Sequence, residues 1–264
     1  MTVLITGAAG GLGRAFANAC AERGYDLFLT DLSGDGLALI AQGIQSRYPV
    51  RVLTHQCDLT RAGDVEALFR AAEAEGAKPD MLLNVAGIDF EGGFYERQAE
   101  ELLQIVRLNV EATLGVTRRA LDSRAPAKPF YIVFVSSLAA FYPMPLKATY
   151  AASKTFLRDF ATALGQELRP YGVRVLTLCP GGLMTTDAAL SGIAAQGFWG
   201  GVTTNALEKI TRRTLTRVLK GDSLYIPGPV NTFFRFVGAL VPRSLIAKLL
   251  YARWQSAQKK WLSV

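Results

Sequence analysis

A tyrosine and a lysine stand four positions apart in the stretch "TYAASK", where Tyr150 and Lys154 interrupt a run of small residues. In a helix, side chains four positions apart lie next to each other on one face. A phenol has a pKa of about 10, which is too high for an efficient base at neutral pH, and a neighbouring ammonium group favours the phenolate. The pair therefore predicts a site of proton transfer, with Tyr150 as acid and base.

Three glycines follow the first aliphatic run in "TVLITGAAGGLG", at Gly7, Gly11 and Gly13. Glycines in such a turn let the backbone approach a pyrophosphate, which then rests on the N-terminus of the following helix. Asp31 ends the next aliphatic run, near the offset of about 20 residues that is typical of a carboxylate that binds ribose hydroxyls. These features predict a dinucleotide site, although Asp31 as a helix cap or a solvated turn residue is the alternative.

The same carboxylate bears on the choice of cofactor. Asp31 would repel a 2′-phosphate, and the glycine turn carries no basic residue, since Arg14 lies beyond it. We therefore expect NAD(H) to be preferred over NADP(H). Asp58, after the third strand, is predicted to accept a hydrogen bond from the adenine while Leu59 covers the ring. Its alternative role is to cap the helix that starts near Arg61.

These residues need a framework that brings them together. Seven short hydrophobic runs alternate with helix-length segments, which predicts βαβ units and a parallel sheet covered by helices on both faces. The predicted strands are 2–6, 25–31, 50–58, 80–87, 129–137, 172–180 and 222–228, and the helices include 11–23, 61–75, 99–122 and 149–169. The fold class is thus α/β, with one doubly wound (Rossmann) domain over residues 1–230 and a basic helical extension over residues 231–264. Ligands of such sheets bind beyond the carboxyl ends of the strands.

The motifs "TGAAGGLG", "NVAG", "LNV", "VSS", "YAASK" and "PGGLMT" occur in this order. Together they resemble the single-domain branch of the short-chain dehydrogenase/reductase family, although Val85 stands where that family usually has a second asparagine. The resemblance implies hydride transfer between a nicotinamide and a CH–OH group. It also implies four catalytic residues. Tyr150 would exchange the proton, Lys154 would bind the nicotinamide ribose, Ser137 would hold the substrate oxygen, and Asn109 would position a water that links Lys154 to solvent.

Further cofactor contacts are expected along the strand ends. With the resemblance, the full predicted set is Gly7, Gly11, Leu12, Gly13, Asp31, Asp58, Leu59, Asn84, Ala86, Gly87, Tyr150, Lys154, Pro180, Gly181 and Thr185. Residues 183–201 are a candidate lid over the substrate. An apolar substrate wall is predicted from Leu183, Met184, Phe198 and Trp199, with Phe141, Tyr142 and Met144, unless these side chains simply pack the loops down. Such a wall would suit a hydrophobic secondary alcohol or ketone, with hydroxysteroids and other lipid-like molecules as candidates.

Composition excludes several other classes of function. The three cysteines are scattered and His55 is the only histidine, so we predict no metal site and no disulfide framework. Free thiols suit a reducing compartment, and we expect a cytoplasmic protein without a membrane-spanning segment. The chain has 29 basic and 22 acidic residues, but no acidic residue follows Asp222. The basic excess therefore belongs to the C-terminal tail, and no module that reads nucleic acid accompanies it.

The tail has an apolar stripe at Ile246, Leu250 and Trp254, which Leu245 and Leu249 widen. Three interpretations stay open: packing on the body or on another subunit, closing over a hydrophobic substrate, and lying on an anionic membrane surface. The resemblance implies a homodimer or homotetramer. A non-catalytic redox sensor and a nucleotide-dependent epimerase are the alternative functions. The first would need none of the four catalytic residue types, and the second usually has a larger C-terminal domain.

Overall fold

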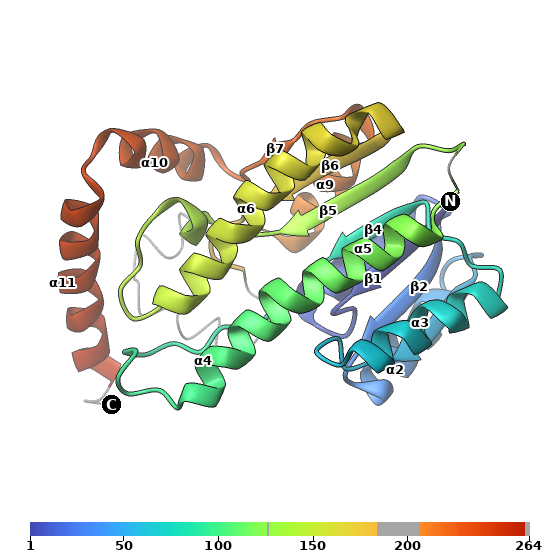
Figure 1. Ribbon diagram of the computed structural model, residues 1–264, viewed down its shortest axis with the longest axis horizontal. Coiled ribbons are helices and arrows are strands. Elements are labelled where there is room, and N and C mark those ends of the chain that lie inside the picture. Colours follow the sequence, from blue (N-terminus) through green and yellow to red (C-terminus); the bar gives the residue numbers. More distant parts are fainter. Residues whose placement is uncertain (126, 184–205, 262–264) are drawn as a thin grey trace.

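The computed structural model describes residues 1–125, 127–183 and 206–261, with side chains described as far as Arg253. Its centre is one sheet of seven parallel strands in the order β3-β2-β1-β4-β5-β6-β7 (Figure 1). The strands are β1 (Thr2–Thr6), β2 (Asp26–Asp31), β3 (Val52–Gln56), β4 (Met81–Asn84), β5 (Phe130–Val135), β6 (Val173–Leu178) and β7 (Leu224–Tyr225). The predicted doubly wound sheet of seven strands is confirmed.

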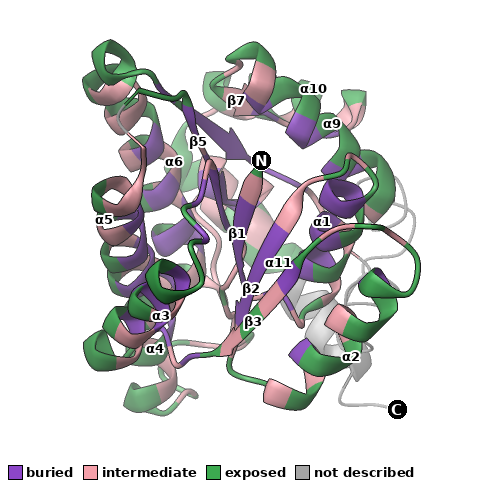
Figure 2. Cartoon of the chain, turned by 90° about the vertical axis from the view of Figure 1, so that its right-hand side faces the viewer, coloured by how far each residue is buried: buried purple, intermediate pink, exposed green. Residues whose placement is uncertain are grey.

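Helices cover both faces of the sheet and enclose two apolar cores. On one face, α1 (Gly11–Ala21), α2 (Gly34–Gln45) and α9 (Leu207–Lys220) pack against the strands. On the other face lie α3 (Ala62–Ala74), α5 (Thr113–Ser123) and α6 (Ala148–Leu168). Successive strand residues point to opposite faces, so Val3 and Ile5 join the first core and Leu4 joins the second. The strands β1, β2, β4, β5 and β6 are mostly buried (Figure 2), which explains their hydrophobic sequences, whereas the edge strand β3 is buried only at Val52.

The strand order reverses beside β1, and this creates the place where a ligand can bind. The chain builds outward from β1 to β2 and β3, and then returns to β4 on the other side of β1. The carboxyl ends of β1 and β4 meet at the paired residues Thr6 and Asn84. In open α/β sheets the crevice at such a switch point is the ligand site. The topology therefore brings the glycine turn and the "NVAG" segment to the same edge.

The helix expected over residues 99–122 has an interruption. It consists of α4 (Ala99–Val106), a π-helical segment over Arg107–Ala112, and α5. Such π turns widen the helix locally and are frequent at functional sites. The segment contains Asn109, one of the predicted catalytic residues. Its hydrophobic pattern continues on both sides, so the sequence alone does not reveal it.

The chain ends in two helices beyond β7. The helix α10 (Pro229–Leu240) and the helix α11 (Arg243–Trp261) form an arm at the edge of the molecule, beyond α6 (Figure 1). Within the part of the chain that the structure describes, no helix is both long enough and apolar enough to span a bilayer.

Candidate active site

The glycine turn is shaped by close contacts between backbone atoms. Gly7 has φ +65°, and a Cβ atom there would lie 2.8 Å from the backbone of Ala86. A Cβ atom on Gly13 would lie 2.1 Å from the carbonyl oxygen of Gly7. Both positions therefore require glycine. The turn leads into α1 at Gly11, and no side chain caps that helix. Its N-terminal amides thus lack a side-chain acceptor, which fits a site for a phosphate group.

Asp31 joins the glycine turn to the end of β2. Its Oδ2 accepts a hydrogen bond from the backbone N–H of Ala9 at 2.9 Å, and its Oδ1 accepts one from the N–H of Ser33 at 3.0 Å. A carboxylate has about four acceptor positions, so two remain for the hydroxyls of a ribose. Asp31 thus has a structural role in the turn, and this role leaves room for the predicted contact with a cofactor.

Three other residues predicted to contact the cofactor have side chains that already bond or pack within the protein. Asp58 accepts hydrogen bonds from the backbone and the hydroxyl of Thr60, at 3.0 and 2.6 Å, and these bonds lower the pKa of Asp58. Leu59 is buried in the core beside α3. The amide of Asn84 is buried and donates to the hydroxyl of Thr117 at 3.0 Å. The predicted contacts of Asp58 and Leu59 with adenine, and of Asn84 with the cofactor, stay predictions.

Thr6 holds the "NVAG" segment against the end of β1. Its hydroxyl accepts hydrogen bonds from the N–H groups of Val85 and Ala86, at 3.1 and 3.2 Å. The next residue, Gly87, lies beside two of the predicted catalytic residues. A Cβ atom on Gly87 would be 3.1 Å from both Asn109 Oδ1 and Lys154 Nζ. The segment from Val85 to Gly87 therefore joins the two ends of the crevice.

The structure brings the four predicted catalytic residues together. Ser137, at the end of β5, hydrogen-bonds Tyr150 on the first turn of α6. Lys154 is 4% exposed, lies 5.6 Å from the centre of the Tyr150 ring, and donates from Nζ to the carbonyl of Val135 at 3.0 Å.

Asn109 is linked to Tyr150 through hydrogen bonds of Ser153. Its Oδ1 accepts from the N–H of Ile88 at 2.9 Å, and its Nδ2 donates to Ser153 Oγ at 3.1 Å. Ser153 in turn donates to the carbonyl of Tyr150 at 2.7 Å. The amide of Asn109 therefore braces the loop after β4 against the first turn of α6.

The protonation of Tyr150 depends on its surroundings in the fold. Burial raises the pKa of Tyr150, the charge of Asp89 raises it further, and the hydrogen bond from Ser137 and the charge of Lys147 lower it only in part. Burial also lowers the pKa of Lys154 to about 8, so this ammonium group is itself poorly stabilised. The pKa of Tyr150 is thus shifted upward in the free protein, and its predicted lowering by Lys154 together with the charge of an oxidised nicotinamide stays a prediction.

A charged cluster beside Tyr150 was not expected from the sequence. Lys147 Nζ lies 2.7 Å from Asp89 Oδ2, and it also bonds Glu91. Burial alone would lower the pKa of Lys147, but the two carboxylates outweigh burial and raise it. Burial raises the pKa of Asp89, although Lys147 opposes this. The Lys147 amine is 5.8 Å from the centre of the Tyr150 ring, so the cluster lies close to the predicted proton-transfer group.

Two signals in the sequence point to this cluster in retrospect. Lys147 precedes Tyr150 by three positions, which is one helical turn, and Asp89 follows "NVAG" by two positions at the same edge of the sheet. The buried Asp89 Oδ1 has no hydrogen-bond partner among the described residues. An orphaned buried oxygen in a native protein calls for an explanation, and one is a hydrogen bond to a ligand.

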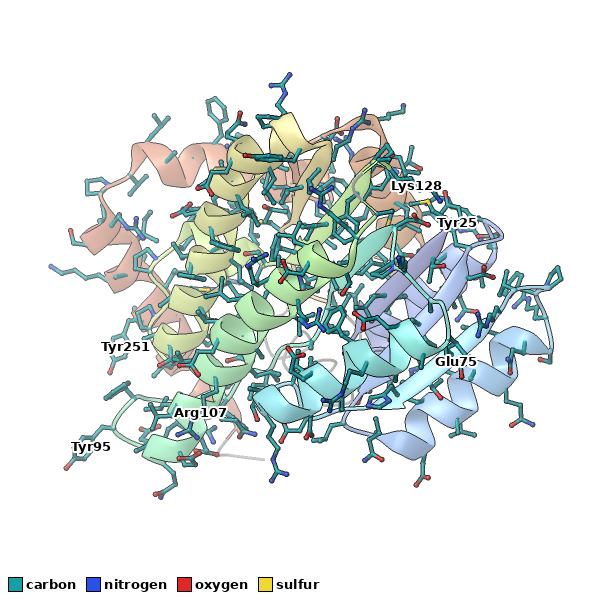
Figure 3. The ribbon with its side chains drawn as sticks, turned by 45° about the vertical axis from the view of Figure 1, so that its right-hand side comes forward. Tyr25, Glu75, Tyr95, Arg107, Lys128 and Tyr251 are labelled. Atoms are coloured by element: carbon teal, nitrogen blue, oxygen red, sulfur yellow. The ribbon has the colours of Figure 1, made fainter. Side chains whose placement is uncertain are left out.

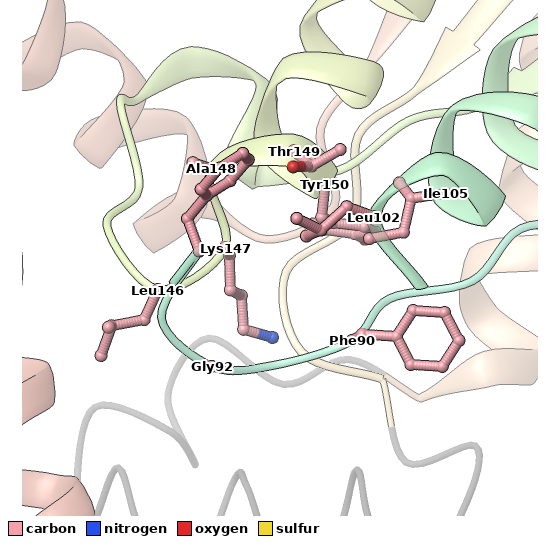
Figure 4. A pocket seen from close by; sticks show the side chains of 10 residues that line it. Phe90, Gly92, Leu102, Ile105, Leu146, Lys147, Ala148, Thr149 and Tyr150 are labelled. Carbon is pink, nitrogen blue, oxygen red and sulfur yellow. The ribbon is translucent and has the colours of Figure 1, made fainter. Parts of the chain in front are cut away.

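A shallow apolar pocket opens beside Tyr150 (Figure 4). Phe90, Leu102 and Ile105 gather on one side, and Leu146 lies on the opposite side. Leu146 has φ +64°, which is unusual for a residue with a side chain. Its carbonyl accepts a hydrogen bond from the N–H of Gly92 at 3.0 Å, so the loops on the two sides of the pocket are joined.

The predicted substrate wall is placed differently. Phe141 lies under the guanidinium of Arg158 at 4.8 Å, Tyr142 packs against α10, and Leu183 packs against the core beside α1. None of the three lines this pocket. Met184, Thr185, Phe198, Trp199 and the rest of the candidate lid after Leu183 lie outside the described residues. Pro180 is described, and its carbonyl accepts from Leu138 N at 2.8 Å, which keeps the "PGG" segment beside Ser137.

The family follows from the comparison with a family model. The model for the short chain dehydrogenases matches residues 1–192. The chain belongs to the short-chain dehydrogenase family. Two solved structures illustrate the likeness. A short-chain dehydrogenase from Sphingobium yanoikuyae in complex with NADPH is 27% identical, with a TM-score of 0.78, and the match covers 90% of this chain and 91% of the other. A family member from Burkholderia phymatum in complex with NAD is 23% identical, with a TM-score of 0.77 and coverage of 89% and 91%, and shows the fold alone.

Curated relatives of this short-chain dehydrogenase are longer proteins. A very-long-chain 3-oxoacyl-CoA reductase from Phaeosphaeria nodorum is 34% identical over 176 residues, which are 65% of this chain and 52% of the relative. A probable oxidoreductase, EphD, from Mycobacterium bovis is 32% identical over 197 residues, or 74% of this chain and 33% of the relative. The chain thus spans about half the length of the reductase it matches. The predicted resemblance to the family is confirmed.

Proposed function

We propose that this short-chain dehydrogenase interconverts a hydrophobic secondary alcohol and its ketone by hydride transfer with NAD(P)(H). One observation carries the proposal: a half-buried tyrosine bonded to Ser137 stands between a buried lysine and a small pocket, on the edge of the sheet that also holds the glycine turn. A sensor of bound dinucleotide would need only the turn. An epimerase would need the same residues, and the substrate panel below distinguishes it.

Each side chain has a part in the proposed reaction. A bound nicotinamide supplies the hydride, or accepts it. Tyr150 gives a proton to the substrate oxygen in reduction and removes it in oxidation, while Ser137 holds that oxygen in place. Lys154, whose amine lies beside Gly87, orients the nicotinamide ribose. Asn109 fixes the loop after β4 and positions a water through which Lys154 exchanges protons with solvent.

The raised pKa of Tyr150 favours one direction of the proposed reaction. Reduction of a ketone needs the protonated phenol, and burial and Asp89 both keep the phenol protonated at neutral pH. Oxidation needs the phenolate and would therefore require a higher pH, or additional positive charge near the ring. We propose that ketone reduction is the direction that this environment suits.

The substrate we propose is a lipid-like ketone that carries no charge next to its carbonyl. Phe90 and Leu102 line a small hollow beside Tyr150 and would meet an apolar group next to the substrate carbonyl. The cluster of Asp89, Glu91 and Lys147 has one negative charge in excess and disfavours a carboxylate beside the carbonyl. Because curated relatives carry the name of 3-oxoacyl-CoA reductases, 3-oxoacyl thioesters are the first candidates and hydroxysteroid ketones the second.

The remaining parts of the proposal concern the cofactor, the assembly and the compartment. We propose that Asp31 makes NAD(H) the preferred cofactor. We also propose a homodimer or homotetramer in the cytoplasm, in which residues 1–230 form the catalytic domain. Exposed Leu103 and Val106 on α4 provide an apolar surface for subunit contacts, and sedimentation analysis would measure the assembly.

The deciding experiment measures turnover and cofactor binding together. NADH and NADPH are titrated by fluorescence, and 3-oxoacyl thioesters, ketosteroids and simple ketones are screened by absorbance. Tyr150→Phe should lower turnover by about 10²–10⁴-fold, the usual contribution of a positioned acid, and leave cofactor affinity nearly unchanged. Tyr142→Phe is the matched control, because Tyr142 lies in the preceding loop and packs against α10. Turnover that survives in Tyr150→Phe would contradict the proposal, and tight binding without turnover of any substrate would favour the sensor.

A further inference from the structure

The helix α10 packs on the body of the protein through polar and small residues. Asn231 is buried and donates a hydrogen bond to a backbone carbonyl at 2.7 Å. The guanidinium of Arg235 lies 5.5 Å from the centre of the Phe141 ring. A Cβ atom on Gly238 would lie 2.2 Å from the ring of Tyr142, so the glycine lets this ring rest directly against the helix. These contacts fix which side of α10 faces inward.

The opposite side of α10 is a row of large apolar side chains exposed to solvent. Phe233, Phe236, Val237 and Leu240 are 64%, 71%, 40% and 79% exposed. Their spacing is that of the buried stripe of an amphipathic helix, but here the stripe faces outward. Figure 2 shows the outer part of α10 as exposed. Contiguous exposed apolar surface of this kind marks a site of interaction.

The neighbouring helix α11 extends this surface with apolar and basic groups. Leu245, Leu249 and Tyr251 are exposed, and Figure 3 shows Tyr251 on the outer side of the arm. The exposed basic side chains on α11 are Arg243, Lys248 and Arg253, whereas Arg235 on α10 faces the body of the protein through Phe141. No carboxylate side chain follows Asp222 anywhere in the sequence. We call the surface over residues 229–253 the arm surface. It exposes large apolar side chains, and all of its charged side chains are basic.

We propose that the arm surface docks on an anionic lipid membrane. Phe233, Phe236 and Leu240 would enter the boundary between headgroups and acyl chains, with α10 lying in the plane of the membrane. The basic side chains would meet the phosphate groups of anionic lipids, which attract clusters of lysine and arginine. This docking needs no membrane-spanning helix.

A second copy of the chain fits the same surface less well. Symmetric pairing of two arm surfaces would bring the same patch of both subunits together. Each patch carries three described positive charges and no carboxylate side chain of its own, so the pairing would place like charges opposite each other. An anionic membrane offers both the apolar interior and the opposite charge.

Vesicle cosedimentation of the full chain tests the proposal. The probes are vesicles of phosphatidylcholine alone and vesicles that also contain phosphatidylglycerol. We expect binding to the anionic vesicles that is at least about tenfold tighter than to the neutral ones, and that weakens as salt is raised. Phe236→Asp and Leu240→Asp should each reduce this binding about tenfold or more, because each places a carboxylate in the apolar layer.

Leu39→Asp is the matched control, since Leu39 on α2 is 71% exposed but lies far from the arm. It should bind anionic vesicles like the wild type, and thermal melting of all variants checks that they are folded. Absence of binding by the wild type, or equal binding by Leu240→Asp and Leu39→Asp, would overturn the proposal. If Leu240→Asp instead converts a dimer to a monomer with unchanged vesicle binding, the stripe belongs to a subunit contact and the proposal fails.

Discussion

The two ends of the crevice are built in different ways. At the nucleotide end, the turn from Gly7 to Gly13 is held by backbone contacts, and both oxygens of Asp31 have backbone partners. At the chemical end, Lys154 is buried and Tyr150 half-buried, and loss of solvent shifts the pKa values of both toward the uncharged forms. At the nucleotide end the polar groups have hydrogen-bond partners, whereas at the chemical end the ionisable groups are costly to charge.

This difference follows from what each end has to do. A binding turn must keep its shape, and backbone hydrogen bonds and close packing provide that at little cost. A group that exchanges protons must have two accessible charge states, so it cannot be fully stabilised in either one. Stability and reactivity therefore lie in different residues of this protein, and substitutions should separate them.

The largest expected effect is at the nucleotide end, from Gly13→Ala. The added methyl group would lie 2.1 Å from the Gly7 carbonyl oxygen, so the backbone of the turn must move. We expect the variant to lose stability on the order of 3 kcal/mol and to show no measurable dinucleotide binding. Gly10→Ala is the control in the same turn, because its Cβ would lie 3.4 Å from the same oxygen and should be tolerated. Chemical denaturation and fluorescence titration measure both, and equal behaviour of the two variants would show that the turn is not rigid.

Lys154→Met should have the opposite effect on stability. The pKa of Lys154 is lowered to about 8 from 10.5, so above pH 8 the folded protein loses a proton that the unfolded chain still holds. Wild-type stability should therefore rise as the pH increases from about 8 to 10.5. At pH 7 the variant should be more stable by roughly 1–3 kcal/mol, lack this rise, and lose turnover. Unfolding at several pH values tests this, and a less stable variant at pH 7 would contradict a costly buried charge.

Asp31→Ala tests whether the scaffold also selects the cofactor. Removal of the carboxylate takes away the repulsion of a 2′-phosphate, so the ratio of NADH to NADPH affinity should fall by about tenfold, or roughly 1.4 kcal/mol. Some stability should be lost too, because the N–H groups of Ala9 and Ser33 lose their acceptor. Titration of both cofactors gives the ratio. A wild type that already binds NADPH better would refute this role of Asp31.

The smallest expected effect is a change of pH dependence from Asp89→Asn. The charge of Asp89 raises the pKa of Tyr150, so its removal should lower that pKa. The rise of alcohol oxidation with pH should then move to lower pH, and Lys147→Met should move it to higher pH. Glu91→Gln should act like Asp89→Asn but more weakly, because Glu91 is more exposed and has a smaller influence. Profiles of kcat/KM against pH test the order of the three variants. An unshifted profile for Asp89→Asn would show that Asp89 does not influence the proton transfer by Tyr150.

The sequence predicted those features that depend on local pattern. Continuous hydrophobic runs predicted the parallel sheet, and the close packing of Gly13 agrees with the predicted turn. Tyr150 and Lys154 are near each other because four residues make about one helical turn, and Ser137 joins them because both β5 and α6 border the same edge of the sheet.

Features that depend on burial and on distant residues could not be predicted in this way. The raised pKa of Tyr150 reflects desolvation, which no spacing reveals. Asp89 and Lys147 are 58 positions apart and belong to different motifs. The π turn around Asn109 leaves the helical pattern intact. The outward direction of the stripe on α10 depends on Gly238 and on the ring that it receives.

The hydrogen bond from Gly92 to the carbonyl of Leu146 couples the loops on the two sides of the pocket. Leu146 holds a left-handed backbone that costs on the order of 1 kcal/mol or more, and the hydrogen bond to the facing loop helps to keep it there. A bulky substrate that spread one wall alone would break this hydrogen bond, so we expect the loop that starts at Asp89 and the loop that ends at Lys147 to shift together. Any widening of the entrance would therefore be transmitted to Tyr150, and the size of the ligand would tune the proton donor itself.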